Sequence, residues 1–98
     1  MKNVTPKLFT ASGIVTAKDA ALCGLQVGVD GINDVTLTVY HGTSAAQGNE
    51  LVPTMILDGT KKILHGGVWG YEKDSPGGMY IEITCAGSCE VILDVGWK

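Results

Sequence analysis

The chain has 98 residues, a net charge of −3 and 45% hydrophobic residues, which suits one small domain with a single core. Only 17% of the residues are charged, and all seven basic residues are lysines. A nucleic-acid-binding surface needs a basic footprint and favours arginine, so this class of function is not expected. A cofactor cleft between two domains does not fit the length. For a chain of this mass, surface scaling predicts about 5,300 Å² exposed after folding.

Alternation of apolar and polar residues is the dominant pattern along the chain. It runs through residues 23–29, 35–40, 79–85 and 91–97, and in each segment the odd-numbered positions are apolar. A period of two predicts strands with one buried face. We therefore predict that the odd-numbered residues of these segments form the core.

Weaker strand signals lie between these segments. Residues 7–10 and 14–17 flank a turn at 11–13, and residues 68–72 predict another short strand. Residues 51–57 contain Pro53, which indicates an edge strand or a bulge. The pair Asp58-Gly59 is a hairpin signal that leads into residues 61–64. The only helix candidate, residues 17–22, is too short and continues into a strand.

These elements predict an all-β protein. We expect a single domain over residues 1–98, a small antiparallel β-sandwich of jelly-roll-like type with seven to eight short strands, because turn signals recur about every ten residues. Residues 1–6, as an N-terminal arm, and the loop 41–50 are expected to be the least regular parts.

No residue pattern points to catalysis, so no enzymatic activity and no cofactor are expected. Ser44, His41 or His65, and an aspartate are the residue types of a catalytic triad, but the sequence has no nucleophile elbow of the G-x-S-x-G type. A zinc site built from Cys85, Cys89 and the two histidines has an unspecific spacing. Residues 30–34 offer oxygen ligands for calcium but lack the bidentate glutamate of an EF-hand. For that segment we favour a polar hairpin turn, and no metal site is expected.

Cys85 and Cys89 are separated by a three-residue turn. Across a hairpin they would face each other within disulfide reach. With Cys23 the chain has three cysteines, whereas a secreted disulfide scaffold normally carries an even number, and a reducing cytoplasm keeps thiols free. Free thiols are therefore the favoured interpretation, with a Cys85–Cys89 disulfide as the alternative.

The most distinctive aromatic residues are Trp69, Tyr71 and Trp97. Tryptophan and tyrosine are common anchors at binding surfaces. For Trp69 we favour a role in the core over a role as a surface anchor, and Tyr71 is alternatively explained as the cap of a strand edge. Trp97 continues the odd-numbered register of the last strand, so it is either a core residue or a contact with a second copy.

The layout resembles the small capsid decoration, or cement, proteins of tailed bacteriophage virions. The resemblance covers residues 7–97 and rests on the opening LFTASGIV at 8–15, which is similar to L-x-x-S-G-x-V with one more residue before the serine. It also rests on CGLQVGVDG at 23–31, VTLTVYHGT at 35–43 and DGT at 58–60, and on the closing GGMYIEITCAGSCEVILDVGW at 77–97. Two features depart from the family pattern: His41 stands where aspartate is usual, and the Cys85/Cys89 pair lies in the closing segment.

The resemblance implies a virion structural protein on the capsid exterior, synthesised in the host cytoplasm, that stabilises the shell by bridging major capsid subunits. Its partners would be the major capsid protein and further copies of itself, with a homotrimer favoured, and neither nucleic acid nor membrane. The expected capsid contacts are the arm residues Lys2, Asn3, Val4, Thr5 and Pro6. The expected self-association or surface contacts are His41, Trp69, Tyr71 and Trp97, together with the loop 41–50. No apolar run approaches the ~20 residues of a membrane span, and no secretory leader is expected.

The alternative function is a receptor- or carbohydrate-binding β-sandwich of a phage fibre or baseplate. It would use Trp69, Tyr71 and Tyr80 as stacking surfaces.

Overall fold

The computed structural model describes residues 4–61 and 65–97, with side chains described for 4–60 and 73–96. The described residues form eight strands and one turn of 3-10 helix. In chain order these are β1 (Val4–Phe9), β2 (Gly13–Thr16), β3 (Ala20–Gly28), β4 (Val35–His41), β5 (Glu50–Leu57), η1 (Gly59–Lys61), β6 (His65–Ser75), β7 (Met79–Cys85) and β8 (Glu90–Trp97). No α-helix occurs in the described ranges, so the predicted all-β class is confirmed.

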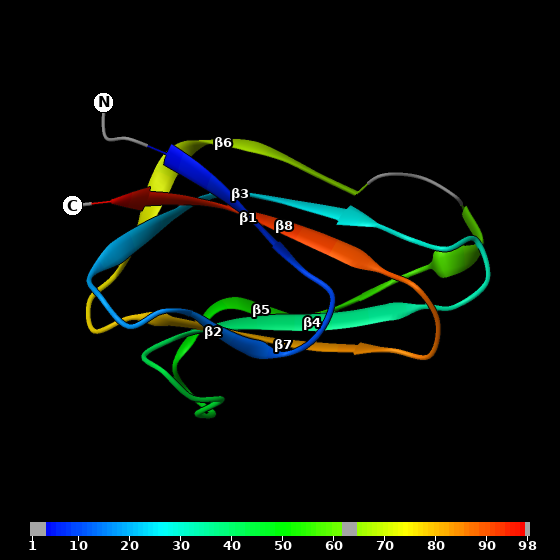
Figure 1. Ribbon diagram of the computed structural model, residues 1–98, viewed down its shortest axis with the longest axis horizontal. Coiled ribbons are helices and arrows are strands. Elements are labelled where there is room, and N and C mark those ends of the chain that lie inside the picture. The colour runs from blue at the N-terminus through cyan, green and yellow to red at the C-terminus, as the bar shows by residue number, and fades with distance from the viewer. Residues whose placement is uncertain (1–3, 62–64, 98) are drawn as a thin grey trace.

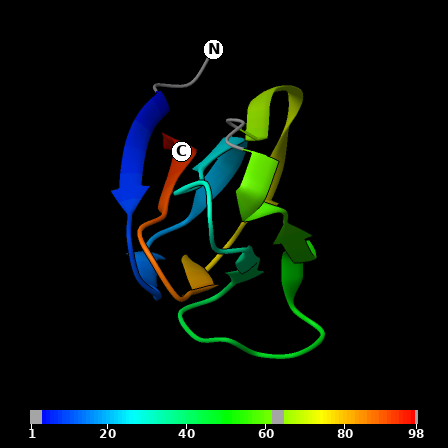
Figure 2. The same cartoon turned by 90° about the vertical axis from the view of Figure 1, so that its right-hand side faces the viewer.

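The strands form two antiparallel four-stranded sheets that face each other as a sandwich (Figures 1 and 2). The first sheet has the order β1-β8-β3-β6 and the second has the order β2-β7-β4-β5. The partners β1/β8, β2/β7, β3/β6 and β4/β5 are those of one long hairpin whose tip is the β4–β5 loop. Wrapping such a hairpin around a core gives the eight-stranded jelly roll, so the predicted jelly-roll-like sandwich is confirmed.

The core lies between the sheets and contains the predicted apolar residues of β4, β7 and β8. The fully buried ones are Val35, Leu37, Val39, Met79, Ile81, Val91, Leu93 and Val95. Ile83 and Cys85 are partly buried and pack against this core. The exposed surface of 5348 Å² agrees with the value expected from mass. Alternation therefore located the buried face of these three strands.

The alternation predicted for residues 23–29 is confirmed at Leu25, Val27 and Val29, which belong to the core or pack against it. It is wrong at Cys23, because a bulge interrupts β3. Its pairing with both neighbours shifts between Leu22 and Gly24. Before the shift Ala20 and Leu22 belong to the core, and after it Leu25 and Val27 do. The extra residue reverses which positions face inward. Cys23 is buried but lies outside the core cluster.

Several predicted hairpins are crossovers between the sheets. The connections β3–β4 and β7–β8 each join strands of different sheets, so segments 30–34 and 86–88 are not hairpin turns. Asp58-Gly59 does not turn a hairpin either, because η1 begins at Gly59 and β5 and β6 lie in different sheets. Asp58 instead accepts the Thr60 backbone N–H at 2.9 Å and the Thr60 hydroxyl at 2.7 Å. Within the described ranges, the β4–β5 loop is the one connection that stays within a sheet.

The prediction for β5 is confirmed, and the prediction for the N-terminal arm is not. β5 is an edge strand, and its pairing with β4 is irregular around Val39, as Pro53 indicated. The predicted irregular arm is wrong for Val4, Thr5 and Pro6, because they belong to β1 and pair with β8.

The predicted helix candidate, residues 17–22, is strand from Ala20 onward. Among the described residues, no helix has the length and apolarity to span a membrane.

Candidate functional site: an apolar stripe and an opposite polar groove

An exposed apolar stripe runs along β1 on the outer face of the first sheet. Phe9 packs against the core, so the even-numbered residues of β1 point outward. Val4 and Leu8 are 38% and 56% exposed, and Pro6 between them is exposed as well. Leu8 pairs with the half-buried Ile92 of β8. We define Val4, Pro6, Leu8 and Ile92 as the β1 stripe.

The β1 stripe ends beside a hollow of about 510 Å³. The hollow lies between the end of β1 and the β7–β8 connection, and its lining residues are Leu8, Thr10, Gly87, Ser88, Cys89 and Glu90. A protruding side chain of a partner could enter it while the stripe covers the adjacent surface. This combination of an apolar strip and a hollow is suited to protein–protein contact.

The edge of β1 is protected against pairing with a further strand. Pro6 has no N–H to offer, which an edge strand tolerates. Lys7 points inward and its ammonium donates to the Val15 carbonyl at 3.0 Å. Proline and inward-pointing charges are common devices that prevent edge-to-edge association. The β1 stripe is therefore a surface for contact through the face of the sheet.

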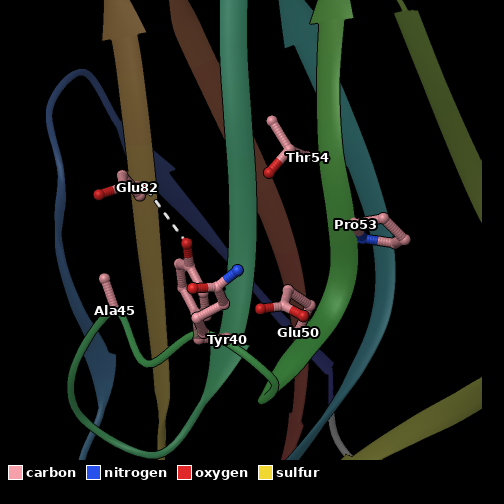
Figure 3. A pocket seen from close by; sticks show the side chains of 7 residues that line it. Tyr40, Ala45, Glu50, Pro53, Thr54 and Glu82 are labelled. Carbon is pink, nitrogen blue, oxygen red and sulfur yellow. Dashed lines mark hydrogen bonds between the residues drawn. The ribbon is translucent and has the colours of Figure 1, made fainter.

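A polar groove lies on the outer face of the second sheet, where β7, β4 and β5 are neighbours (Figure 3). It has a volume of about 430 Å³ and is lined by Tyr40, Ala45, Gln47, Glu50, Pro53, Thr54 and Glu82. The Tyr40 hydroxyl donates to Glu82 Oε1 at 3.2 Å, as the dashed line in Figure 3 shows. We refer to this feature as the Tyr40 groove.

The groove is negatively charged. Its lining contains Glu50 and Glu82 but no lysine. Burial raises the pKa of Tyr40, and the hydrogen bond to Glu82 and its negative charge raise it further. Tyr40 therefore keeps its proton and remains a donor to Glu82. Its ring lies beside that of Tyr80, with the ring centroids 6.5 Å apart.

The sequence-predicted site residues are not gathered in one place. Val4, Thr5 and Pro6 lie on β1, and half-buried His41 ends β4 in the other sheet. Lys2 and Asn3 lie outside the described residues, as do the side chains of His65, Trp69, Tyr71 and Trp97. The described residues contain no group of three or more His, Cys, Asp or Glu that could hold a metal ion.

Sequence reasoning missed Leu8, Tyr40, Glu50 and Glu82 as candidate surface residues. The signal for Tyr40 and Glu82 was the even-numbered face of the strands at 35–40 and 79–85, which also carries Tyr80. Alternation alone predicts only that this face points away from the core. The separation of 42 positions between Tyr40 and Glu82 meant that only the sheet order could bring them together.

Asp30 anchors the loops at the end of the sandwich that carries the β3–β4 and β7–β8 connections. Its Oδ1 accepts the backbone N–H groups of Ile32 at 2.8 Å and Asn33 at 2.7 Å. Its Oδ2 accepts the Asn33 side-chain amide at 2.8 Å and the Ser88 N–H at 3.2 Å. The carboxylate considered as a calcium ligand is thus engaged by protein donors. It ties together two crossovers that are distant in sequence.

We expect Asp30 to make stability fall at acidic pH. The N–H groups of Asn33 and Ile32 and the Asn33 amide lower the pKa of Asp30 from 3.8 to about 2. Because the folded pKa is depressed, the stabilisation is present above about pH 4 and is lost as the pH falls towards 2. Asp30→Asn should melt below wild type at pH 7, and the difference should shrink towards pH 2. Thermal melts followed by circular dichroism measure this.

Glu90→Gln is the matched control, because it removes one exposed carboxylate at the same end of the molecule. It should follow the wild-type melting profile at each pH. A difference between wild type and Asp30→Asn that stays constant from pH 7 to 2 would contradict the role of the ionised carboxylate.

In the structure Cys85 and Cys89 are both free thiols. They flank the β7–β8 crossover, and their thiols interact. Burial of Cys89, which is 6% exposed, raises its pKa to about 12, with Cys85 and the charge of Asp30 adding to the effect. A thiol that holds its proton this firmly is a weak nucleophile. Cys89 is a core residue in this state.

Comparisons of the chain with protein-family models, with curated proteins and with solved structures found no match.

Proposed function

We propose that this protein is a decoration protein of a tailed-phage virion, which stabilises the capsid by bridging major capsid subunits. The observation that carries the proposal is the β1 stripe with its adjacent hollow. Val4, in the segment where the resemblance places the capsid contact, and Leu8, on the same face of β1, are large apolar residues left exposed at 38% and 56%. Covering them by a partner would remove apolar surface from water, which favours association.

Other features support the same proposal. A low charged fraction of 17% suits a surface that is largely covered in an assembly. Repetition of one weak contact over a symmetric shell raises the overall avidity without a large interface. The proposal includes a homo-oligomer, with a trimer favoured by the resemblance. The β4–β5 loop, which projects from the sandwich (Figure 2), offers a further contact surface beside His41.

We predict that Leu8→Glu weakens attachment to the shell without unfolding the protein. Full burial of a leucine is worth about 1.5–3 kcal/mol, and burial of a charge in its place opposes binding, so affinity should fall at least about tenfold. The measurement is co-sedimentation with expanded shells assembled from the major capsid protein of the same phage. Because Leu8 is exposed, the melting temperature should stay near that of wild type.

Ile56→Glu is the control for the added charge. Ile56 is 71% exposed and pairs with Thr36 in the second sheet, away from β1. This variant should bind shells as wild type does. If both variants lose the same affinity for shells, or if Leu8→Glu keeps full affinity, the β1 stripe is not the capsid-binding surface.

A further inference from the structure

We infer that the Tyr40 groove is a binding site for a neutral saccharide. The groove and the β1 stripe lie on the outer faces of opposite sheets. A chain attached through the stripe therefore leaves the groove open to solvent. The inference is independent of shell attachment, and its test uses the isolated protein.

The polar groups of the groove are already held in place without a ligand. Glu82 accepts the Tyr40 hydroxyl, and Glu50 Oε2 accepts the Gly48 N–H at 2.8 Å. The Thr54 hydroxyl is hydrogen-bonded to that of Thr38 at 2.7 Å. Groups fixed in advance lose little conformational entropy when a ligand binds. Preorganisation of this kind is expected of a binding site.

The hydrogen-bonding capacity that remains selects a ligand rich in donors. Each carboxylate has one oxygen in these bonds and can accept further hydrogens on the other. The Tyr40 hydroxyl donates its hydrogen to Glu82. Adjacent hydroxyls of a sugar ring can donate to a carboxylate while accepting from the amide of Gln47, which also lines the groove.

The charge of the groove decides between saccharide classes. The Lys73 ammonium donates to the Leu51 carbonyl at 2.8 Å, beside Glu50 in the sequence, but Lys73 is not part of the lining. The lining contains no lysine and therefore offers no ammonium to an acidic sugar. Glu50 and Glu82 would repel it. A simple cation is also a poor fit, because both carboxylates are exposed and surface ion pairs contribute little. A neutral ring that forms several hydrogen bonds at once fits the lining better.

The dimensions and the apolar parts of the lining agree with this class. About 430 Å³ lies within the usual range for small-molecule sites. Ala45 from the β4–β5 loop and the side of the Tyr40 ring supply apolar surface, and Figure 3 shows Tyr40, Glu50 and Glu82 converging from three neighbouring strands. Sugar rings offer both apolar C–H faces and polar edges, as such a surface requires.

The test is a titration of the isolated protein with methyl glycosides of glucose, galactose and N-acetylglucosamine, followed by NMR shifts of backbone amides. At millimolar concentrations, at least one glycoside should shift amides of β4, β5 and β7. Glu82→Gln and Glu50→Gln should each weaken binding about tenfold, the loss expected when a charged acceptor becomes neutral. Glu90→Gln on the other sheet should bind as wild type does.

Two further probes complete the test, N-acetylneuraminic acid as the anionic sugar and arginine methyl ester as the cation. Neither should shift the groove amides as strongly as the neutral glycoside. The inference is overturned if no neutral glycoside shifts these amides or if either charged probe shifts them more strongly. Unchanged affinity in Glu82→Gln and Glu50→Gln would also overturn it. Shell co-sedimentation does not depend on any of these outcomes, so each proposal can fail alone.

Discussion

Leu93→Ala should destabilise the protein by about 3 kcal/mol, within the range of 2–5 kcal/mol for large core truncations. Leu93 is fully buried at the centre of the first sheet, where it pairs with Lys7 of β1 and Leu25 of β3. Its loss removes apolar contacts and leaves a cavity between the sheets. For a domain of this size, the melting temperature should fall by roughly 15 °C. Thermal and urea denaturation measure the effect.

Leu8→Ala is the matched control, because it makes the same truncation on the adjacent strand. Leu8 is 56% exposed and Leu93 is fully buried. The control should change stability by less than about 0.5–1 kcal/mol. Equal destabilisation by the two substitutions would contradict the assignment of Leu93 to the core and of Leu8 to the outer surface.

Gly78→Ala should destabilise the protein by about 3 kcal/mol through two effects. Gly78 has φ +114, a conformation that side-chain-bearing residues rarely adopt. A Cβ atom at this position would also lie 2.6 Å from the Thr16 carbonyl oxygen, which forces the β2 end of the sandwich apart. The shift would disturb the Gly78 carbonyl, which accepts hydrogen bonds from the Ser75 hydroxyl and the Gly42 N–H. The free energy of unfolding in urea measures this loss.

Gly48→Ala separates the two effects. Gly48 has φ +97, but a Cβ atom there would meet nothing within 4 Å. Its substitution should show only the backbone effect, about 1–2 kcal/mol. The difference between the two variants measures the steric overlap at Gly78. Equal values would mean that the close approach of Thr16 contributes nothing.

The fold class followed from the sequence because period-two alternation is a local property. In β4, β7 and β8 the odd-numbered apolar residues whose side chains are described belong to the core or pack against it. In β3 the prediction failed at Cys23, because a single bulge between Leu22 and Gly24 reverses the alternation; Gly24 is the one local sign, since a glycine inside a strand often accompanies a bulge. A pattern that depends on unbroken spacing cannot reveal an inserted residue.

The connections were misassigned because turn chemistry does not specify the partner strand. Segments such as Asp58-Gly59 and 86–88 indicate that the chain turns, and it does. Whether the following strand joins the same sheet is decided by long-range pairing, here of β8 with β1 and β3. The hydrogen bond between Asp30 and Ser88 could not be predicted for the same reason, since the two residues are 58 positions apart in the sequence.

The candidate surfaces were the least predictable part. The β1 stripe lies partly in the segment assigned to an irregular arm, so Val4 and Pro6 were named without their shared face. Leu8 was not named, because an exposed leucine can be identified only once its neighbours are known. The Tyr40 groove required three strands to become adjacent, in the order β7-β4-β5.

The most direct measurement is a cryo-electron microscopy map of expanded shells of the same phage saturated with the protein. We expect density at sites that bridge major capsid subunits, with β1 and β8 facing the shell and the Tyr40 groove facing outward. Saturated shells without added density, or density in which the second sheet faces the shell and the β1 stripe faces solvent, would contradict this expectation.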